Sequence, residues 1–173
     1  MNSTILANVW RFIILVLLQV LVLKAVVFNT GVWAYLQVII YPLFIILLPL
    51  RTPPTLVVFL GFVCGMLVDL FYSSIGIHAA ATVFIAYFRT YILAILEPRG
   101  GYNVNFSPTA KRFGFPWFLR YAAIMLGLHL FIYFSIKAFT FYYILQIILN
   151  TLFTFLVSFL FILFYQSIFD PQE

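Results

Sequence analysis

Long apolar runs alternate with short polar breaks along the whole chain. The breaks fall near 29–31, 51–54, 73–76, 97–116 and 137–140. A helix needs about 20 apolar residues to cross the hydrocarbon core of a bilayer, and each run comes close to that length. The pattern therefore predicts a bundle of six membrane-spanning helices, at about 9–28, 32–50, 54–72, 77–96, 117–136 and 141–165.

The composition restricts the fold class to an integral membrane protein. Hydrophobic residues make up 66% of the 173 residues and charged residues 8%, against about 25% charged in a typical soluble domain. Nine Lys or Arg and four Asp or Glu are too few to cover the surface of a water-soluble monomer. Six spans leave no room for a soluble domain, so we expect a single all-α transmembrane domain over residues 1–173.

Two of the apolar runs carry additional information. No small-residue cleavage site follows the run at 9–28, so we interpret it as a retained span and not as a signal peptide. The run at 32–50 contains Pro42, which a membrane helix tolerates although it removes a backbone donor. We expect this second helix to be kinked at Pro42.

Basic residues indicate which side of the membrane each helix end faces, because Lys and Arg near span ends are retained in the cytoplasm. With the N-terminus inside, the outer ends carry two basic residues, Lys24 and Lys137. The inner ends carry seven: Arg11, Arg51, Arg89, Arg99, Lys111, Arg112 and Arg120. This bias predicts that both termini (N-in/C-in) and the loop at 97–116 are cytoplasmic.

Several classes of function are disfavoured by the residue types present. Cys64 is the only cysteine, which excludes an intrachain disulfide framework and a multi-cysteine metal site. The net charge of +5 includes no basic stretch long enough for a nucleic-acid groove. Asp69 and Glu97 lie near opposite faces on this topology, and a Ser73, His78 and Asp69 set lacks an oxyanion-hole motif. We therefore expect no catalytic residues, no cofactor and no metal site.

Asp69 is the only acid inside a predicted span, where an unpaired carboxylate is costly. Gly61 and Gly65 precede it at four-residue intervals, and glycines at this spacing let another helix backbone approach closely. In one interpretation this face is an ordinary packing groove with a hydrated acid near the surface. In the other, Asp69 anchors the outer hairpin through His78 or through one of the two outer lysines.

Other polar positions also need an explanation inside a membrane. His78 follows the turn at 73–76 and is interpreted as a hydrogen-bonding cap, because too few other ligands accompany it for a metal site. Arg89 lies well inside its span, so its side chain either snorkels to the surface or is a buried donor facing the bundle interior. The sixth span carries a polar stripe at four-residue steps, formed by Gln146, Asn150, Thr154 and Ser158. Interhelical hydrogen bonding is the default explanation for that stripe.

The segment from Pro54 to Arg89 contains a compound motif. It reads Gly61-x-x-x-Gly65-x-x-x-Asp69, then Gly76-x-His78-Ala79, then Ala86-Tyr87. This combination resembles the signature of the bacterial rod-shape-determining MreD family. The close match covers about 36 residues, and the rest of the chain agrees with that family in length, span count and the break between spans four and five.

The resemblance implies a non-enzymatic scaffold of the cell-elongation complex in the bacterial cytoplasmic (inner) membrane, with a role in cell shape and side-wall peptidoglycan synthesis. The partners it implies are a bitopic MreC-like protein, an MreB-like filament, a RodA-like glycan polymerase and an elongation-specific penicillin-binding transpeptidase. It also implies a six-helix bundle similar to the substrate-binding subunits of energy-coupling-factor transporters. The candidate structural or partner-binding residues are Gly61, Gly65, Asp69, Gly76, His78 and Arg89.

Two other functions stay open at this point. A small-molecule or lipid-binding transport subunit would use a polar cluster near the outer face, formed by Asp69, His78, Lys24 and Gln37. A membrane hydrolase would need a reactive serine, which an active-site serine probe detects. The sparse basic residues of the loop at 97–116 would contact anionic lipid or a cytoplasmic filament, although such charges are usually topological anchors.

Overall fold

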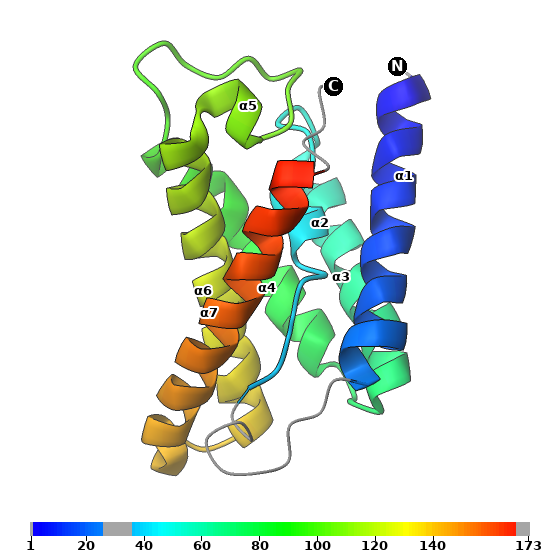
Figure 1. The fold of residues 1–173 in the computed structure, drawn as a ribbon, viewed down its shortest axis with the longest axis vertical. Coiled ribbons are helices and arrows are strands. Elements are labelled where there is room, and N and C mark those ends of the chain that lie inside the picture. Colours follow the sequence, from blue (N-terminus) through cyan, green and yellow to red (C-terminus); the bar gives the residue numbers. More distant parts are fainter. Residues whose placement is uncertain (1, 26–35, 169–173) are drawn as a thin grey trace.

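The structure, a computed structural model, describes residues 2–25 and 36–168. Within these ranges the chain is helical and contains no strand, and five helices are long and apolar enough to cross a membrane. The chain is therefore a multi-pass membrane protein (Figure 1). The long helices are α1 (Asn2–Leu17), which continues through a π-helical turn (Leu18–Val22) and a 3₁₀ turn (Leu23–Ala25), α3 (Pro54–Tyr72), α4 (Ile77–Ile95), α6 (Phe115–Ala138) and α7 (Ile144–Ile168). The short helices are α2 (Leu43–Leu47), α5 (Ala110–Phe113) and a 3₁₀ turn (Phe141–Tyr143).

The limits of α3 and α4 follow directly from local sequence signals. Pro54 is the first residue of α3, where its missing N–H costs nothing. The helix ends at Tyr72 because Ser73 adopts a left-handed conformation with φ of 54°. Gly76, with φ of 78°, then precedes the first turn of α4, a conformation that glycine adopts without strain. These two helices were predicted at 54–72 and 77–96.

The expectation of a helix over 32–50 is wrong for the described residues 36–50, which we call the second pass. Only Leu43–Leu47 are helical, and residues 36–40 form no regular structure. Pro42 has no N–H to continue a helix through this point. Leu48, the residue before Pro49, has ψ of 141°, because a following proline disfavours the helical conformation. The predicted turn at 29–31 and residues 32–35 lie outside the described residues.

The second pass crosses the bundle from one end to the other. The turns at 73–76 and 139–143 lie at one end, called the turn end, and the loop at 97–114 lies at the other, called the loop end (Figure 1). Gln37 contacts residues at the turn end, whereas Arg51 N–H donates to the Val104 carbonyl at the loop end. Within residues 2–25 and 36–168, five passes through the bundle are thus long helices, and residues 36–50 make one further pass. α1 begins and α7 ends at the loop end.

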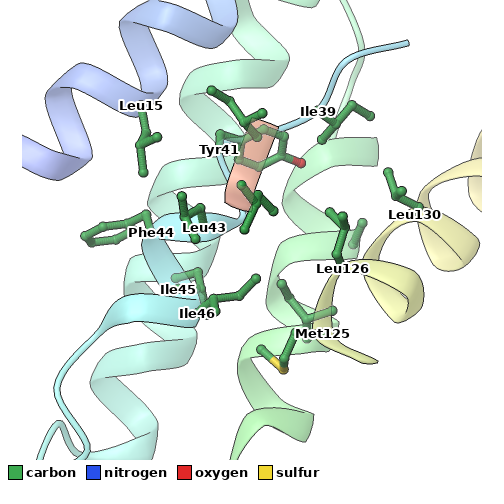
Figure 2. Close-up of a cluster of buried hydrophobic side chains, with 14 of the residues drawn as sticks. Leu15, Ile39, Tyr41, Leu43, Phe44, Ile45, Ile46, Met125, Leu126 and Leu130 are labelled. Atoms are coloured by element: carbon green, nitrogen blue, oxygen red, sulfur yellow. The ribbon is translucent and has the colours of Figure 1, made fainter. Parts of the chain in front are cut away.

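The second pass forms the centre of the hydrophobic core. Its short helix α2 spans about one and a half turns, so its side chains point to all sides. Four of them nevertheless have no exposed surface: Leu43, Ile45, Ile46 and Leu47. Figure 2 shows Leu43, Ile45 and Ile46 between Leu15 of α1 and the α6 residues Leu126 and Leu130. A helix that is apolar on all sides is buried on all sides. The neighbouring helices therefore shield this segment from lipid, which is the condition under which irregular backbone is tolerated in a membrane.

The loop end is closed by hydrogen bonds between the loop and the helix ends. Trp117 Nε1–H donates to the Leu96 carbonyl at 2.7 Å, and the Tyr102 hydroxyl donates to the Leu93 carbonyl at 2.8 Å. Burial raises the pKa of Tyr102 to about 12. The loop is therefore packed against α4 and α6 instead of being a free linker.

Candidate functional site

The motif residues of α3 and α4 form one unit, the hairpin, which we define as residues 54–95. The tightest glycine contact of the hairpin is at Gly65, where an added Cβ would lie 2.3 Å from Ala79 Cα and 2.7 Å from the His78 carbonyl oxygen. At Gly61 an added Cβ would lie 3.1 Å from Ala86 Cβ. The glycines thus allow α4 to pack directly against the backbone of α3, as their spacing predicted.

Asp69 lies one turn further along the same face and is 3% exposed. Its carboxylate accepts hydrogen bonds from the backbone N–H groups of His78 at 3.1 Å and Ala79 at 2.9 Å. It also accepts a hydrogen bond of 2.7 Å from the Ser74 hydroxyl. The first backbone N–H groups of a helix have no partner within the helix, and a carboxylate there is favoured by the helix dipole. Asp69 therefore caps α4 from the neighbouring helix.

This arrangement decides between the two interpretations of Asp69. The acid is buried, so the interpretation as a hydrated surface group is wrong. It anchors the hairpin as the alternative expected, but through backbone amides and Ser74 instead of a basic side chain. Lys24 donates to the Phe71 carbonyl, and the Lys137 ammonium lies over the Tyr133 ring.

His78 takes part in a different contact from the one predicted. Its side chain does not cap α4, which begins after Gly76, but is 1% exposed and points into the core. The Tyr41 hydroxyl lies 3.0 Å from His78 Nδ1 and 3.0 Å from His129 Nε2, and the Thr82 hydroxyl donates to it at 3.3 Å. Tyr41 of the second pass is thus bonded to α4 and α6 at once.

Arg89 is a buried donor, with 4% of its surface exposed, so the snorkelling interpretation is wrong. Its Nε–H donates to the Tyr121 hydroxyl at 3.1 Å, and Nη2 donates to the Leu48 carbonyl. Tyr121 in turn donates to the Ile46 carbonyl at 3.1 Å. Arg89 and Tyr121 therefore satisfy two carbonyls at the end of α2, where the helix leaves its last acceptors unpaired.

The backbone of the second pass takes further partners from the π-helical turn that follows α1 and from α7. Gln19 is fully buried, and its side-chain amide forms two hydrogen bonds with the backbone of the second pass. It donates to the Val38 carbonyl and accepts from Ile40 N–H, each at 2.9 Å. The Ser158 hydroxyl accepts a 2.8 Å hydrogen bond from Ile39 N–H. Thr154 does the same for Gln37 N–H at 3.2 Å. These side chains replace the ladder that a helix would supply.

Part of this network was predictable from the amino-acid sequence. The stripe on α7 was expected to bond a neighbouring helix, whereas two of its members bond backbone amides of the second pass. Gln19 was missed. Its signal was a lone amide in the middle of an apolar run, which in a membrane needs a partner that can both donate and accept.

The alternatives that need convergent side chains are not supported by this geometry. The His78 ring bonds Tyr41, and Asp69 bonds Ser74, so Ser73, His78 and Asp69 do not form a hydrogen-bonded triad. Within the described ranges, no three His, Cys, Asp or Glu side chains gather closely enough to hold a metal ion. The members of the predicted polar cluster have different hydrogen-bond partners. Gln37 accepts from the Tyr133 hydroxyl and lines a cavity with Lys137, whereas Asp69, His78 and Lys24 make the contacts given above.

Comparison with known protein families, curated proteins and solved structures finds no significant match for this chain. The geometry itself indicates what the site can do. Glycine contacts and a capped helix start hold α3 and α4 together, and a buried polar network holds the hairpin to the second pass. The opposite face of the hairpin is exposed, with Phe59, Phe62, Tyr87, Phe88 and Tyr91 among its exposed side chains. The site is therefore a closely packed helical hairpin with one exposed face.

Proposed function

We propose that this protein is a non-enzymatic scaffold of the bacterial cell-elongation complex in the cytoplasmic (inner) membrane. Two arguments support the proposal. The motif Gly61, Gly65, Asp69, Gly76 and His78 resembles that of the MreD family. These residues are also adjacent in space, where they fix the shape of the hairpin.

The observation that carries the proposal is a groove on the exposed face of the hairpin. The groove has a volume of about 510 Å³ and is lined by Pro54, Thr55, Val58, Tyr87, Thr90 and Tyr91. Four of these residues carry hydroxyl groups, and the hydroxyls of Tyr87 and Tyr91 lie 3.3 Å apart. A polar group that faces hydrocarbon is costly unless it finds a partner. A groove with this lining suits a helix that brings polar atoms of its own.

The partner we assign to this groove is the single transmembrane helix of a bitopic MreC-like protein. Threonine and small residues favour close helix association in membranes, and tyrosine contributes an apolar ring with a polar tip. The RodA-like polymerase and the penicillin-binding transpeptidase would join the same assembly. With the loop end in the cytoplasm, the loop at 97–114 would face an MreB-like filament.

Depletion of the protein in its native host tests the cellular role. We expect rod-shaped cells to become round or to lose control of their width, because side-wall synthesis loses its organisation. Labelling of new peptidoglycan in the same cells should change from the side wall to a dispersed pattern. Unchanged cell shape and unchanged labelling would contradict the proposal.

Co-purification of the MreC-like partner tests the groove directly. We expect the pair of substitutions Tyr87→Phe and Tyr91→Phe to reduce the recovered partner while the abundance of the protein in the membrane stays constant. Tyr142→Phe is the matched control, because Tyr142 is 85% exposed but lies at the turn end, away from the groove. Equal recovery with all variants would rule out this groove as the contact.

A further inference from the structure

A second cavity lies at the turn end, and its lining differs from that of the groove. It has a volume of about 490 Å³, within the range of about 300–1,000 Å³ that is usual for small-molecule sites. It is bounded by the last turn of α6, the first turns of α7 and the start of the second pass. Its lining residues are Gln37, Phe134, Lys137, Ala138, Tyr143, Gln146, Ile147 and Asn150.

The lining carries one positive charge and no negative charge. Lys137 is the only charged residue among those that line the cavity. Its ammonium lies 5.6 Å from the Tyr133 ring centroid and 5.9 Å from that of Phe134, so two aromatic faces hold it in place. The carboxylate of Asp69, at the same end, is already bonded to two amides and a hydroxyl. An anion in this cavity would therefore be attracted by Lys137 and would meet no acidic side chain in the lining.

Three carboxamide side chains, those of Gln37, Gln146 and Asn150, line the same cavity as Lys137. Gln146 and Asn150 lie one helical turn apart on α7, so their side chains share a face. The Gln37 side-chain oxygen accepts a hydrogen bond of 3.4 Å from the Tyr133 hydroxyl, which leaves its amide N–H₂ group to donate to a ligand. A cation with several neutral donors is the combination that binds a phosphate group.

The surroundings favour an amphipathic ligand over a small soluble anion. Leu152, Leu156 and Leu160 follow the cavity along α7 toward the loop end and are 52%, 52% and 66% exposed. An acyl chain that leaves the cavity along α7 would cover this apolar surface, which stabilises binding in proportion to the buried area.

We propose that the Lys137 cavity binds the phosphate headgroup of an anionic membrane lipid, with Lys137 opposite the phosphate and the acyl chains along α7. The inference is independent of the scaffold role, since it concerns the opposite end of the bundle and different residues. A free phosphate shares the headgroup chemistry, and the test below separates the two sources.

The test uses the full-length protein, purified in detergent and stripped of lipid. Dioleoyl phosphatidylglycerol is titrated, and binding is followed by native mass spectrometry and by the shift in the unfolding temperature. Dioleoyl phosphatidylcholine, which has the same chains and no net charge, is titrated in parallel. We expect tighter binding of phosphatidylglycerol, and we expect Lys137→Gln to weaken it about tenfold, as for the loss of one charge-assisted hydrogen bond.

Two control variants make the result specific. Lys24→Gln removes the other lysine at the turn end, whose ammonium is bonded to the Phe71 carbonyl outside the cavity, and should leave binding unchanged. Lys137→Arg keeps the charge and should retain most of the affinity, which separates lost binding from lost folding. Equal weakening by Lys24→Gln and Lys137→Gln would overturn the proposal, because it indicates general attraction to the positive protein. Binding of glycerol phosphate as tight as that of the lipid would overturn the assignment to a membrane lipid.

Discussion

The Asp69 carboxylate accepts a hydrogen bond of 2.9 Å from the backbone N–H of Ala79, in the first turn of the neighbouring helix. The tightest glycine contact of the same helices is between Gly65 and Ala79, so the close packing and the cap depend on each other. A carboxylate that is surrounded by backbone donors needs no basic partner to be stable inside a protein. This relationship explains how the lone acid of the spans is accommodated.

Asp69→Asn should destabilise the hairpin. The amide would keep one acceptor oxygen but would place N–H donors against the backbone N–H groups of His78 or Ala79. We expect the free energy of unfolding to fall by about 1–3 kcal/mol, the usual cost of an unsatisfied buried group. Reversible unfolding in detergent micelles measures this change. Glu97→Gln is the control, because Glu97 lies on the exposed rim of the loop end, and a loss as large as for Asp69→Asn would contradict the prediction.

Gly65→Ala should be more damaging than an alanine elsewhere in the bundle. The new methyl group would meet backbone atoms of Ala79, which cannot rotate away, so α3 and α4 would have to separate. We expect a loss of about 2–3 kcal/mol from this overpacking. Gly127→Ala in α6 is the matched control, since its Cβ would meet only the Phe155 ring at 3.9 Å, an ordinary contact. Thermal unfolding of the two variants side by side is sufficient, and equal stability would show that the helices can adjust.

Ser158→Ala should loosen the second pass locally. The hydroxyl is the acceptor for Ile39 N–H, and alanine leaves this buried amide without a partner. We expect faster hydrogen exchange at the Ile39 amide and a stability loss of about 1–3 kcal/mol. Ser135→Ala is the control, because the Ser135 hydroxyl donates only to the Phe131 carbonyl of its own helix. Unchanged exchange at Ile39 would mean that another group takes over the role of Ser158.

Arg89→Lys should destabilise the protein even though it keeps the positive charge. A guanidinium donates to the Tyr121 hydroxyl and the Leu48 carbonyl from two separate nitrogens, which one ammonium cannot do in the same geometry. We expect a loss of about 1–3 kcal/mol from the unpaired carbonyl. Arg120→Lys, at an exposed position of α6, should have little effect. Urea unfolding monitored by tryptophan fluorescence compares the two, and equal midpoints would contradict the role assigned to Arg89.

The sequence was sufficient to predict the helix limits and the close packing of the hairpin, because the signals for both are local. Proline at the start of α3, a turn containing Gly76 and glycines at four-residue spacing each act on their immediate surroundings. The partner of Asp69 was expected among basic side chains, since residue types indicate side chains only. Backbone N–H groups at the start of α4 are present in every helix, whatever its sequence, and this made them easy to overlook.

The second pass could not be predicted in the same way. Hydropathy measures transfer out of water and does not distinguish a lipid-facing helix from an irregular segment that other helices enclose. Pro42 indicated a kink, but the backbone of this segment is satisfied by side chains far away in the sequence. Gln19 and the hydroxyls of α7 are informative only in combination, because each is common by itself in membrane helices.

The distance along the chain between the second pass and its partners restricts the order of biogenesis. Thr154 and Ser158 follow the amides that they pair with by 117 and 119 residues. Until the final helix has entered the bilayer, residues 36–40 have no lipid-compatible way to hold this conformation. The native core must therefore close at the end of synthesis, and a chain truncated before α7 is a natural substrate for membrane quality control.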